Sequence, residues 1–492
     1  MNARLPLVLA AALLTLALSS AGPAPRASAA PPITFHCTLD ANCPAITIAG
    51  DPYATLGGNP APFRGYGDPS LEYDPMTGTL WLSYSWLDVL VSDPNPPPQI
   101  DLGVRTHLAS STDNGDTWTF TNALNATTVI SHPDTSTQGW TQHEVSSLLR
   151  EGPGSWQAMW LDYFDPLGEP AGPEDRSDFY YTRSLASTRA GLDASPVPWA
   201  RGSGTSPSFG AVHNLSLIPQ LSDCAAFTEP ALFTDGYVTY LATNCVVFSG
   251  GVRQDDEERL ILLRQETNGY SYVGSLLTYA DAVDLGATRI EQGDIAYTQD
   301  GGIILIVTPI VSGGTPEHHG CVVFEISDLA SAEVYRDASG DAVPLALISG
   351  DDPTFGPGAC TYDPASETGI LMHVHDYTAS PFAMEFSVRE TGVHPLADTD
   401  SDGWTNAREA TIGTDADAPC GFTPGGDPAS GSWPADLVES DNVNISDVLS
   451  LKPVFGSVVP PASARYDIVP SGAINIQDVL RLKPPFGASC TP

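Results

Sequence analysis

Four acidic residues have the type and spacing to carry chemistry: Asp68, Glu144, Glu229 and Asp294. Each opens a run of apolar and β-branched residues that a glycine-containing turn follows, so we expect the four to stand at equivalent points of four repeats. Cleavage of a glycosidic bond needs one carboxylic acid to protonate the leaving oxygen and a second carboxylate on the anomeric side. If the four side chains face a shared channel, they supply both groups. The competing interpretation is that they cap turns at the openings of strands.

The runs that carry these residues repeat one pattern. The repeats are GDPSLEYDPMTGTLWLSYSW (67–86), HEVSSLLREGPGSWQAMWLDYF (143–164), TEPALFTDGYVTYLATN (228–244), GDIAYTQDGGIILIVT (293–308) and CTYDPASETGILMHVHDY (360–377). They begin about 65 to 85 residues apart, a spacing typical of a β-propeller. A two-sheet sandwich would not place an acid at the opening of each hairpin. We therefore predict an all-β propeller over residues 30–394, with five blades or, as the alternative, six.

Composition limits the partners. The chain of 492 residues has a formal net charge of −39, and its only lysines are Lys452 and Lys483, so nucleic acid and anionic membranes are excluded as partners. Residues 5–18 are uncharged and small residues follow, which predicts a secretory signal peptide over residues 1–29. No later run is long enough to span a membrane. A secreted, extracellular protein is expected.

The cysteines support export. The count of eight is even, which in an exported chain favours disulfides over a thiol site. Sequence alone leaves the pairing open. Proximity along the chain favours Cys37 with Cys43, Cys224 with Cys245, Cys321 with Cys360, and Cys420 with Cys490.

A second unit begins near Pro395, where Asp, Gly and Asn replace the aromatic-rich runs. Within residues 395–419, the stretch DTDSDGWTNARE (398–409) matches an EF-hand-type loop position by position. The predicted Ca²⁺ ligands are Asp398, Asp400, Asp402, Trp404 through its carbonyl, Asn406 and Glu409.

Residues 420–492 contain two similar segments, DLVESDNVNISDVLSLKPVFG (436–456) and DIVPSGAINIQDVLRLKPPFG (467–487). The pair resembles a dockerin, a duplicated loop-helix module that binds calcium and docks to cohesin domains. The resemblance implies calcium ligands at Asp436, Asn444, Asp447, Asp467, Asn475 and Asp478, and a cohesin-type scaffold protein as a partner. Two ligand positions in each loop hold valine and serine, so weak calcium binding is expected there.

The octet STDNGDTW (111–118) resembles the Asp box of sialidases, and Phe63-Arg64 resembles the opening segment of that family. The resemblance implies a substrate-binding role for Arg64, a channel role for Glu229, and a nucleophilic tyrosine at Tyr362 or Tyr377. However, Thr243-Asn244 stands where the family has an arginine that binds the sialic acid carboxylate, and asparagine cannot supply that charge. Sialic acid is therefore not the expected substrate.

The Asp-Pro-Ser opening at Asp68 and the segment around Glu229 are also similar to five-bladed furanosidase-like propellers. That resemblance implies Asp68 as general base and Glu229 as general acid, with Glu144 or Asp294 tuning them. The expected protein is a secreted glycoside hydrolase acting on an extracellular polysaccharide or glycan. The alternative is a non-catalytic propeller that binds carbohydrate or a surface and is anchored through its tail.

Histidines are the remaining candidate ligands. His373 and His375 alternate along one run, and His318 and His319 precede a cysteine. Most such histidines are structural or surface residues, so we predict no catalytic metal from them.

Overall fold

Short strands of alternating and β-branched residues make up most of the computed structural model. It describes residues 32–38, 42–93, 99–131, 136–152, 155–167, 180–188, 215, 218–250, 252–266, 269–298, 302–314, 317–337, 340–350, 355–376, 384–394, 404, 408–409, 412–415, 433–438, 440, 442–459, 461–469 and 473–489. The statements below concern these residues.

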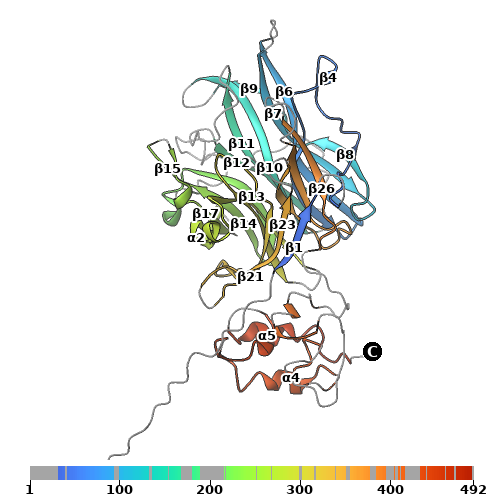
Figure 1. Ribbon diagram of the computed structural model, residues 1–492, viewed down its shortest axis with the longest axis vertical. Helices are drawn as coiled ribbons and strands as arrows, with labels where there is room; N and C mark the ends of the chain where they lie inside the picture. Colours follow the sequence, from blue (N-terminus) through green and yellow to red (C-terminus); the bar gives the residue numbers. More distant parts are fainter. Residues whose placement is uncertain are drawn as a thin grey trace, which may run out of the picture.

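The described strands form five antiparallel blades (Figure 1). Blade 1 contains β5 (Phe63–Asp74), β6 (Thr79–Asp93), β7 (Gln99–Ser111) and β8 (Trp118–Ala123). Blade 2 contains β9 (Val129–Ser131), β10 (Gln138–Gly152), β11 (Ser155–Pro166) and β12 (Tyr180–Thr188). Blade 3 contains β13 (Ala226–Thr234), β14 (Thr239–Val246), β17 (Arg259–Glu266) and β18 (Gly269–Thr278).

Blade 4 contains β19 (Arg289–Tyr297), β20 (Ile303–Ile310), β21 (Cys321–Asp328), β22 (Glu333–Val334) and β23 (Pro344–Gly350). Blade 5 contains β24 (Phe355–Thr361), β25 (Leu371–Asp376) and β26 (Met384–Glu390). The shorter strands are β1 (Ile33–Cys37), β2 (Ile48–Ala49), β3 (Thr55–Leu56), β4 (Asn59–Pro60), β15 (Phe248–Ser249) and β16 (Val252–Arg253). The helices of this part are η3 (Pro219–Leu221), η4 (Asp255–Glu257) and α2 (Tyr279–Asp284).

The blades close into a ring. The innermost strands β5, β10, β13, β19 and β24 contact one another in that order, and β24 returns to β5. Parallel pairing of β26 with the start of β5 seals the junction between blades 5 and 1, while β1 pairs in parallel with β23 on blade 4. The predicted all-β propeller is confirmed, with five blades rather than six.

Each innermost strand carries the same β-bulge. Across the bulge the inner strand has one residue more than its partner, between Gly67 and Ser70 in blade 1 and at matching points in the other four. The extra residue has a positive φ of 44° to 54° at Asp68, Val145, Glu229, Gln292 and Ala359. Non-glycine residues adopt this backbone only where the surroundings hold it, so the five positions are structurally equivalent.

Side-chain oxygens two residues beyond the bulge connect neighbouring blades. Ser70 accepts a hydrogen bond of 3.2 Å from the backbone N–H of Leu148, and Ser147 accepts one of 2.8 Å from Leu232. Thr361 accepts one of 3.0 Å from Leu71, across the junction between blades 5 and 1. At these positions each innermost strand pairs with a neighbouring strand on one side only, so the bonds satisfy amides of the other edge and hold neighbouring blades in a fixed register.

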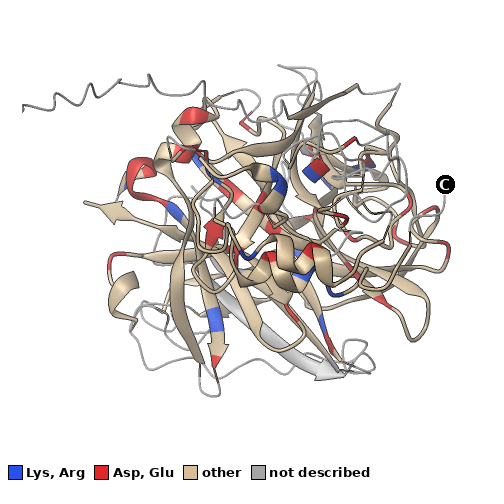
Figure 2. Ribbon diagram, turned by 90° about the horizontal axis from the view of Figure 1, so that it is seen from below, with Lys and Arg blue, Asp and Glu red and all other residues tan. Residues whose placement is uncertain are grey.

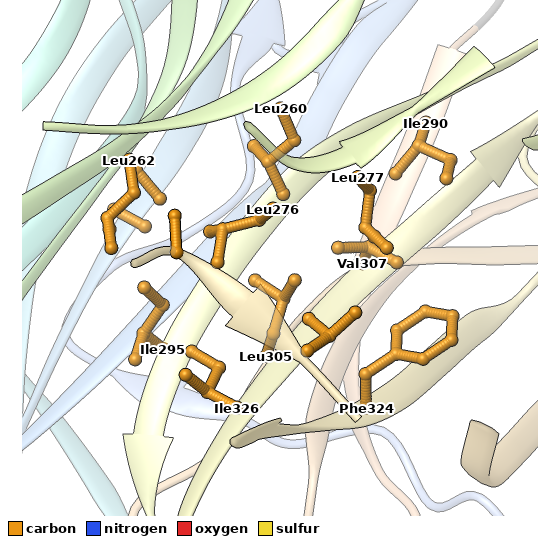
Figure 3. Close-up of a cluster of buried hydrophobic side chains, with 14 of the residues drawn as sticks. Leu260, Leu262, Leu276, Leu277, Ile290, Ile295, Leu305, Val307, Phe324 and Ile326 are labelled. Carbon is orange, nitrogen blue, oxygen red and sulfur yellow. The ribbon is translucent and has the colours of Figure 1, made fainter. Parts of the chain in front are cut away.

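Apolar side chains fill the space between blades. Figure 3 shows part of the largest cluster, which contains Leu262 of blade 3 together with Leu305 and Phe324 of blade 4. These three are almost fully buried, and burial of each stabilises the fold by about 2 kcal/mol. Trp81 and Trp156 pack edge to face between blades 1 and 2, with ring centroids 6.3 Å apart.

The octet resembling an Asp box forms the predicted hairpin between β7 and β8. Ser111 Oγ accepts from the N–H of Gly115 at 2.9 Å, and Asp113 accepts from the N–H of Thr117 at 3.0 Å. Gly115 has φ +104°, and Trp118 is buried. These features belong to a turn and place no group in the channel.

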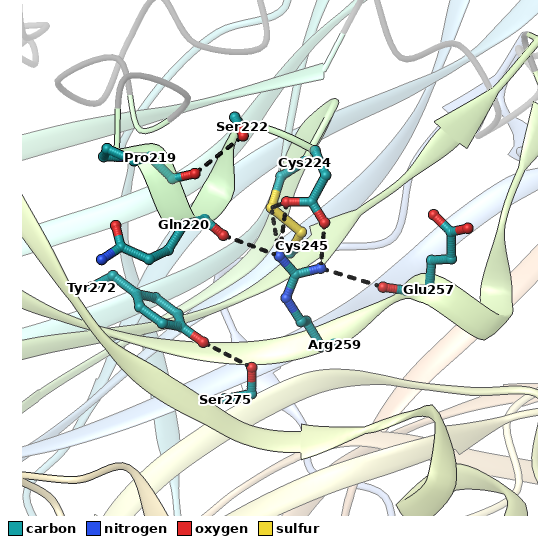
Figure 4. The surroundings of a disulfide bond; sticks show 10 residues. Pro219, Gln220, Ser222, Cys224, Cys245, Glu257, Arg259, Tyr272 and Ser275 are labelled. Carbon is teal, nitrogen blue, oxygen red and sulfur yellow. Dashed lines mark hydrogen bonds and ion pairs between the residues drawn. A yellow bond between two sulfur atoms is a disulfide. The ribbon is translucent and has the colours of Figure 1, made fainter.

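Three of the predicted disulfides are present: Cys37–Cys43, Cys224–Cys245 and Cys321–Cys360. Figure 4 shows the second, beside which Arg259 forms two 2.9 Å bonds to the carboxylate of Asp223. The predicted pairing of Cys420 with Cys490 lies outside the described residues.

The tail contains α4 (Ile445–Ser450), η6 (Ala464–Tyr466) and α5 (Ile476–Arg481). Asn444 and Asn475 cap the two α-helices, each with an aspartate three residues on that completes a capping box. A buried ion pair between Arg408 and Glu325 of β21 attaches the tail to blade 4. Trp404 is buried in the tail core, and the guanidinium of Arg481 lies 4.5 Å from its ring centroid.

Acidic residues are spread around the molecule, whereas basic residues are few and scattered (Figure 2). None of the helices in the described ranges has the length and apolar character needed to cross a membrane. The signal peptide predicted for residues 1–29 lies outside those ranges.

Candidate active site

A cavity of about 210 Å³ lies at the end of the central channel where the innermost strands begin. It is lined by residues of β5, β10, β13 and β19 at and just before the bulges, together with His318, His373 and Phe386. All five blades therefore contribute side chains to one site.

The five bulge residues form a ring of unlike groups. Asp68 and Glu229 supply carboxyls, Gln292 an amide, Val145 an apolar side chain and Ala359 only a methyl group. The first four line the cavity. Asp68 and Glu229 thus occupy equivalent positions on blades 1 and 3, with one blade between them.

The other two predicted carboxylates do not occupy equivalent positions. Glu144 lines the cavity but precedes its bulge by one residue, at the level of Glu291 on blade 4. Asp294 follows its bulge by two residues, at the level of Ser70. It contributes to a narrower cavity deeper in the channel and accepts hydrogen bonds from Thr361 and from the backbone of Tyr362. The prediction that all four acids share one level is wrong, and Asp294 takes the place of a connecting side chain between blades.

Asp68 is held as a carboxylate by its neighbours. Its Oδ1 lies 3.1 Å from Nδ1 of His373 and accepts a 3.2 Å hydrogen bond from Nε2 of Gln292. Burial raises the pKa of Asp68, but hydrogen bonds from His373 and Ser85 outweigh it and hold the pKa below its ordinary value. An ionised carboxylate that reaches a cavity can accept a proton from water.

Two histidines extend this arrangement. Nε2 of His373 lies 3.0 Å from Nδ1 of His318, whose ring packs against Gly358, where a Cβ atom would lie 2.9 Å from it. Burial, together with the neighbouring His373, lowers the pKa of His318 to about 3. His318 is therefore neutral at physiological pH. The sequence pattern favoured structural roles for both histidines, yet they line the cavity.

The pKa of Glu229 is shifted in the opposite direction to that of Asp68. Burial raises its pKa well above the ordinary value, and the charges of Glu291, Asp68 and Glu144 raise it further. Its Oε2 atom is buried without a hydrogen-bond partner among the described residues. A raised pKa favours the protonated form of the carboxyl, which can donate its proton.

Two arginines line the cavity, and each is paired with carboxylates. Arg253 bonds to Glu258 at 2.8 Å and to Glu291 at 2.5 Å, while Arg289 bonds to Glu291 at 2.7 Å and to Glu317 at 3.2 Å. Burial raises the pKa of Glu291, but the two arginines outweigh it and hold the pKa at about 2. The cluster carries more negative than positive charge, so it does not attract an anionic ligand.

Of the other residues that the sialidase resemblance singled out, none of those described lines the cavity. Arg64 does not line the cavity, because its guanidinium pairs with Glu385 and donates a 2.6 Å bond to the carbonyl of Ala61. Tyr362 is buried in an apolar cluster, so it is not a nucleophile in the cavity, and Tyr377 lies outside the described residues. Asn244 is buried on β14 opposite Thr228.

Sequence reasoning missed Gln292 and Glu291. The dipeptide Gly293-Asp294 has the same sequence as Gly67-Asp68. This identity suggested that Asp294 is equivalent to Asp68, whereas the equivalent residue, Gln292, lies two positions earlier on blade 4. A bulge leaves no residue-type signature here, since its positive-φ position holds five different residue types.

The predicted calcium ligands are only partly described. Asp398, Asp400, Asp402 and Asn406 lie outside the described residues, whereas Glu409 is fully buried.

In the repeated segments, each loop has two buried carboxylates, at Asp436 and Asp447 and at Asp467 and Asp478. Asp447 and Asp478 each accept two backbone N–H bonds, of 2.7 to 3.1 Å. Paired buried carboxylates fit an oxygen-binding cation such as Ca²⁺.

Neither a family model nor a curated protein matches this sequence. Among solved structures, a GH43 endo-arabinanase from Bacillus licheniformis is 15% identical with a TM-score of 0.38, over 69% of this chain and 96% of that chain. A native arabinanase from Bacillus subtilis is 12% identical with a TM-score of 0.34, over 69% and 96%. An endo-arabinase from Bacteroides thetaiotaomicron is 12% identical with a TM-score of 0.38, over 66% and 94%. These values are too low to place the chain in a family.

Proposed function

We propose that this protein is a glycoside hydrolase that acts on a neutral extracellular glycan, with Asp68 as general base and Glu229 as general acid. The observation that carries the proposal is that two cavity carboxyls, at equivalent bulges of blades 1 and 3, have pKa values shifted in opposite directions. Environments that separate the pKa values of two carboxyls are how glycosidases assign the acid and the base.

The roles follow from each environment. Glu229 donates its proton to the leaving oxygen as the glycosidic bond breaks, because its carboxyl is protonated and buried. Asp68 accepts a proton from the attacking water. Glu144 and Glu291 add negative charge near Glu229, which favours its protonated form.

A neutral substrate fits the charge of the cavity. Both arginines are occupied by Glu258, Glu291 and Glu317, so neither is free to bind a sugar carboxylate. Negligible release of sialic acid from a simple sialoside is expected.

The tail supports a second role, attachment through a cohesin-type partner. Ile445 and Leu449 on α4 are exposed, as are Ile476 and Leu480 at the same positions of α5. Repeated exposed apolar side chains on two helices favour a protein-binding surface. The alternative, a binding propeller without catalysis, would use the same tail.

Hydrolysis of a substrate panel by the secreted full-length protein tests the proposal. The panel contains aryl glycosides and polysaccharides, including arabinan and xylan, and release of reducing sugar is measured. Glu229→Gln and Asp68→Asn should each lower turnover at least ~10²-fold without changing the unfolding temperature by more than a few degrees. Sugar binding without turnover would favour the binding propeller. Turnover that survives both substitutions would exclude the proposed pair.

A further inference from the structure

Gln292 is the bulge residue on the innermost strand of blade 4, and its side chain reaches across the channel. Its Nε2 atom donates a 3.2 Å hydrogen bond to Oδ1 of Asp68 on blade 1, although blade 5 stands between blades 4 and 1. Blade 5 has Ala359 at the equivalent position. Its methyl group is too short to stand between the side chains of Gln292 and Asp68.

The other end of the amide has no partner. Oε1 of Gln292 is buried without a hydrogen bond among the described residues, and so is Oε2 of Glu229 at the equivalent bulge of the adjacent blade 3. Both residues line the cavity. Buried polar atoms without partners are rare, and at a site they mark positions where a ligand or a rearranged side chain completes the bonding.

An amide can donate only through nitrogen and accept only through oxygen. Its nitrogen therefore suits a carboxylate, whereas its oxygen suits a protonated carboxyl or a hydroxyl group. A side chain that presents nitrogen to Asp68 must turn its oxygen away from Asp68, toward the rest of the cavity.

We propose that Gln292 is a positioning residue that assigns the two carboxyls their roles, its amide N–H keeping Asp68 ionised as the base and its amide oxygen favouring the proton on Glu229. This inference rests on the proposed function and adds a group that enforces the division between acid and base.

Other charged and titratable groups face the same two carboxyls. His373 and His318 lie on the side of Asp68, and Glu144, Glu291 and Arg253 act on Glu229. Gln292 differs from all of them because it is uncharged at every pH. Its removal therefore changes hydrogen bonding without changing the charge of the cavity.

The pH dependence of kcat/KM for Gln292→Leu tests the proposal. Loss of the N–H donor raises the pKa of Asp68, so the acid limb moves to higher pH. Loss of the acceptor weakens the protonated form of Glu229, so the basic limb moves to lower pH. Each limb of the pH profile of kcat/KM should move by about half a pH unit or more, so the bell-shaped profile should become narrower on both sides. Gln220→Leu, at an exposed side chain outside the cavity, is the matched control and should leave both limbs in place. A fall in kcat with both limbs unmoved would overturn the proposal, because a structural role alone lowers the rate in that way.

A second measurement does not depend on activity. In a double-mutant cycle of Gln292→Leu with Asp68→Asn, urea unfolding at pH 7 should show coupling of about tenfold in the unfolding equilibrium constant. Gln292→Met replaces the leucine variant if the latter does not fold. Absence of coupling would overturn the proposal. Coupling in a protein that hydrolyses no substrate would reject the proposed function while supporting the pairing of Gln292 with Asp68.

Discussion

Nδ1 of His373 on blade 5 lies 3.1 Å from Oδ1 of Asp68 on blade 1, so this interaction crosses the junction at which the propeller closes. The carboxylate of the candidate base is therefore also part of the closure of the ring. Its protonation state should affect both chemistry and stability.

His373→Phe is expected to reduce the dependence of stability on pH in the acid range. In the folded protein the pKa of Asp68 lies below its unfolded value, because hydrogen bonds from His373 and Ser85 outweigh burial. The stabilisation is thus present above the unfolded pKa and is lost as pH falls through the folded pKa. Urea unfolding at pH 7 and pH 3 should show a smaller difference in the variant than in the wild type. An unchanged difference would show that His373 does not hold Asp68 ionised.

Arg253→Met is expected to destabilise the protein strongly. Arg253 is the shared partner of Glu258 and Glu291, and its removal leaves two buried carboxylates with less compensation. Breaking such a cluster from one side costs about 3 to 5 kcal/mol in the free energy of unfolding. The exposed pair of Arg264 with Glu266 provides the control, since Arg264→Met should cost less than about 1 kcal/mol. Equal losses in the two variants, measured by urea unfolding, would contradict the expectation.

Removal of the disulfide Cys321–Cys360 is expected to lower stability more than removal of an exposed polar contact. The bond joins β21 of blade 4 to β24 of blade 5 and closes a loop with a sequence separation of 39. Restriction of the unfolded chain by a loop of this size accounts for about 4 kcal/mol. Replacement of both cysteines by alanine should lower the unfolding temperature in calorimetry. The change should exceed that of Ser222→Ala, which removes one exposed hydrogen bond.

Calcium is expected to bind the full-length protein at one tight site and up to two weak ones. The tight site is the loop 398–409 predicted from the sequence. Asp400→Ala should therefore eliminate the tight-binding phase of a calorimetric calcium titration. At the weak sites, burial raises the pKa of Asp478 to about 6, although backbone hydrogen bonds lower it in part. Calcium binding there should release protons below about pH 6, and Asp478→Asn should abolish that release. Absence of any calcium binding at millimolar concentration would reject the predicted sites.

The repeat spacing was enough to predict a propeller of five or six blades, because each blade must bury one meander with its own turn. The positions of Asp68 and Glu229 could also be predicted, since each is followed by proline at the opening of a strand. A proline there has no N–H, which suits a point where the ladder is interrupted.

The register within blades 2 and 4 could not be predicted. A shift of one residue along a strand turns a side chain to the other face, and the bulge adds such a shift at a point the residue types do not mark. Glu144 therefore lies one residue before the expected level, and Asp294 two residues beyond it. The environment of His373 depends on the closure of the ring, which brings together residues 305 positions apart.

The ion pair between Arg408 and Glu325 shows at which end of the propeller the tail is attached. Glu325 pairs with Ile304, which pairs with Ala296, four residues beyond the bulge of β19 and away from the cavity. The tail is thus attached at the end of the propeller opposite the cavity, where Figure 1 shows α4 and α5. A protein held by its tail would therefore present the mouth of the cavity away from its point of attachment.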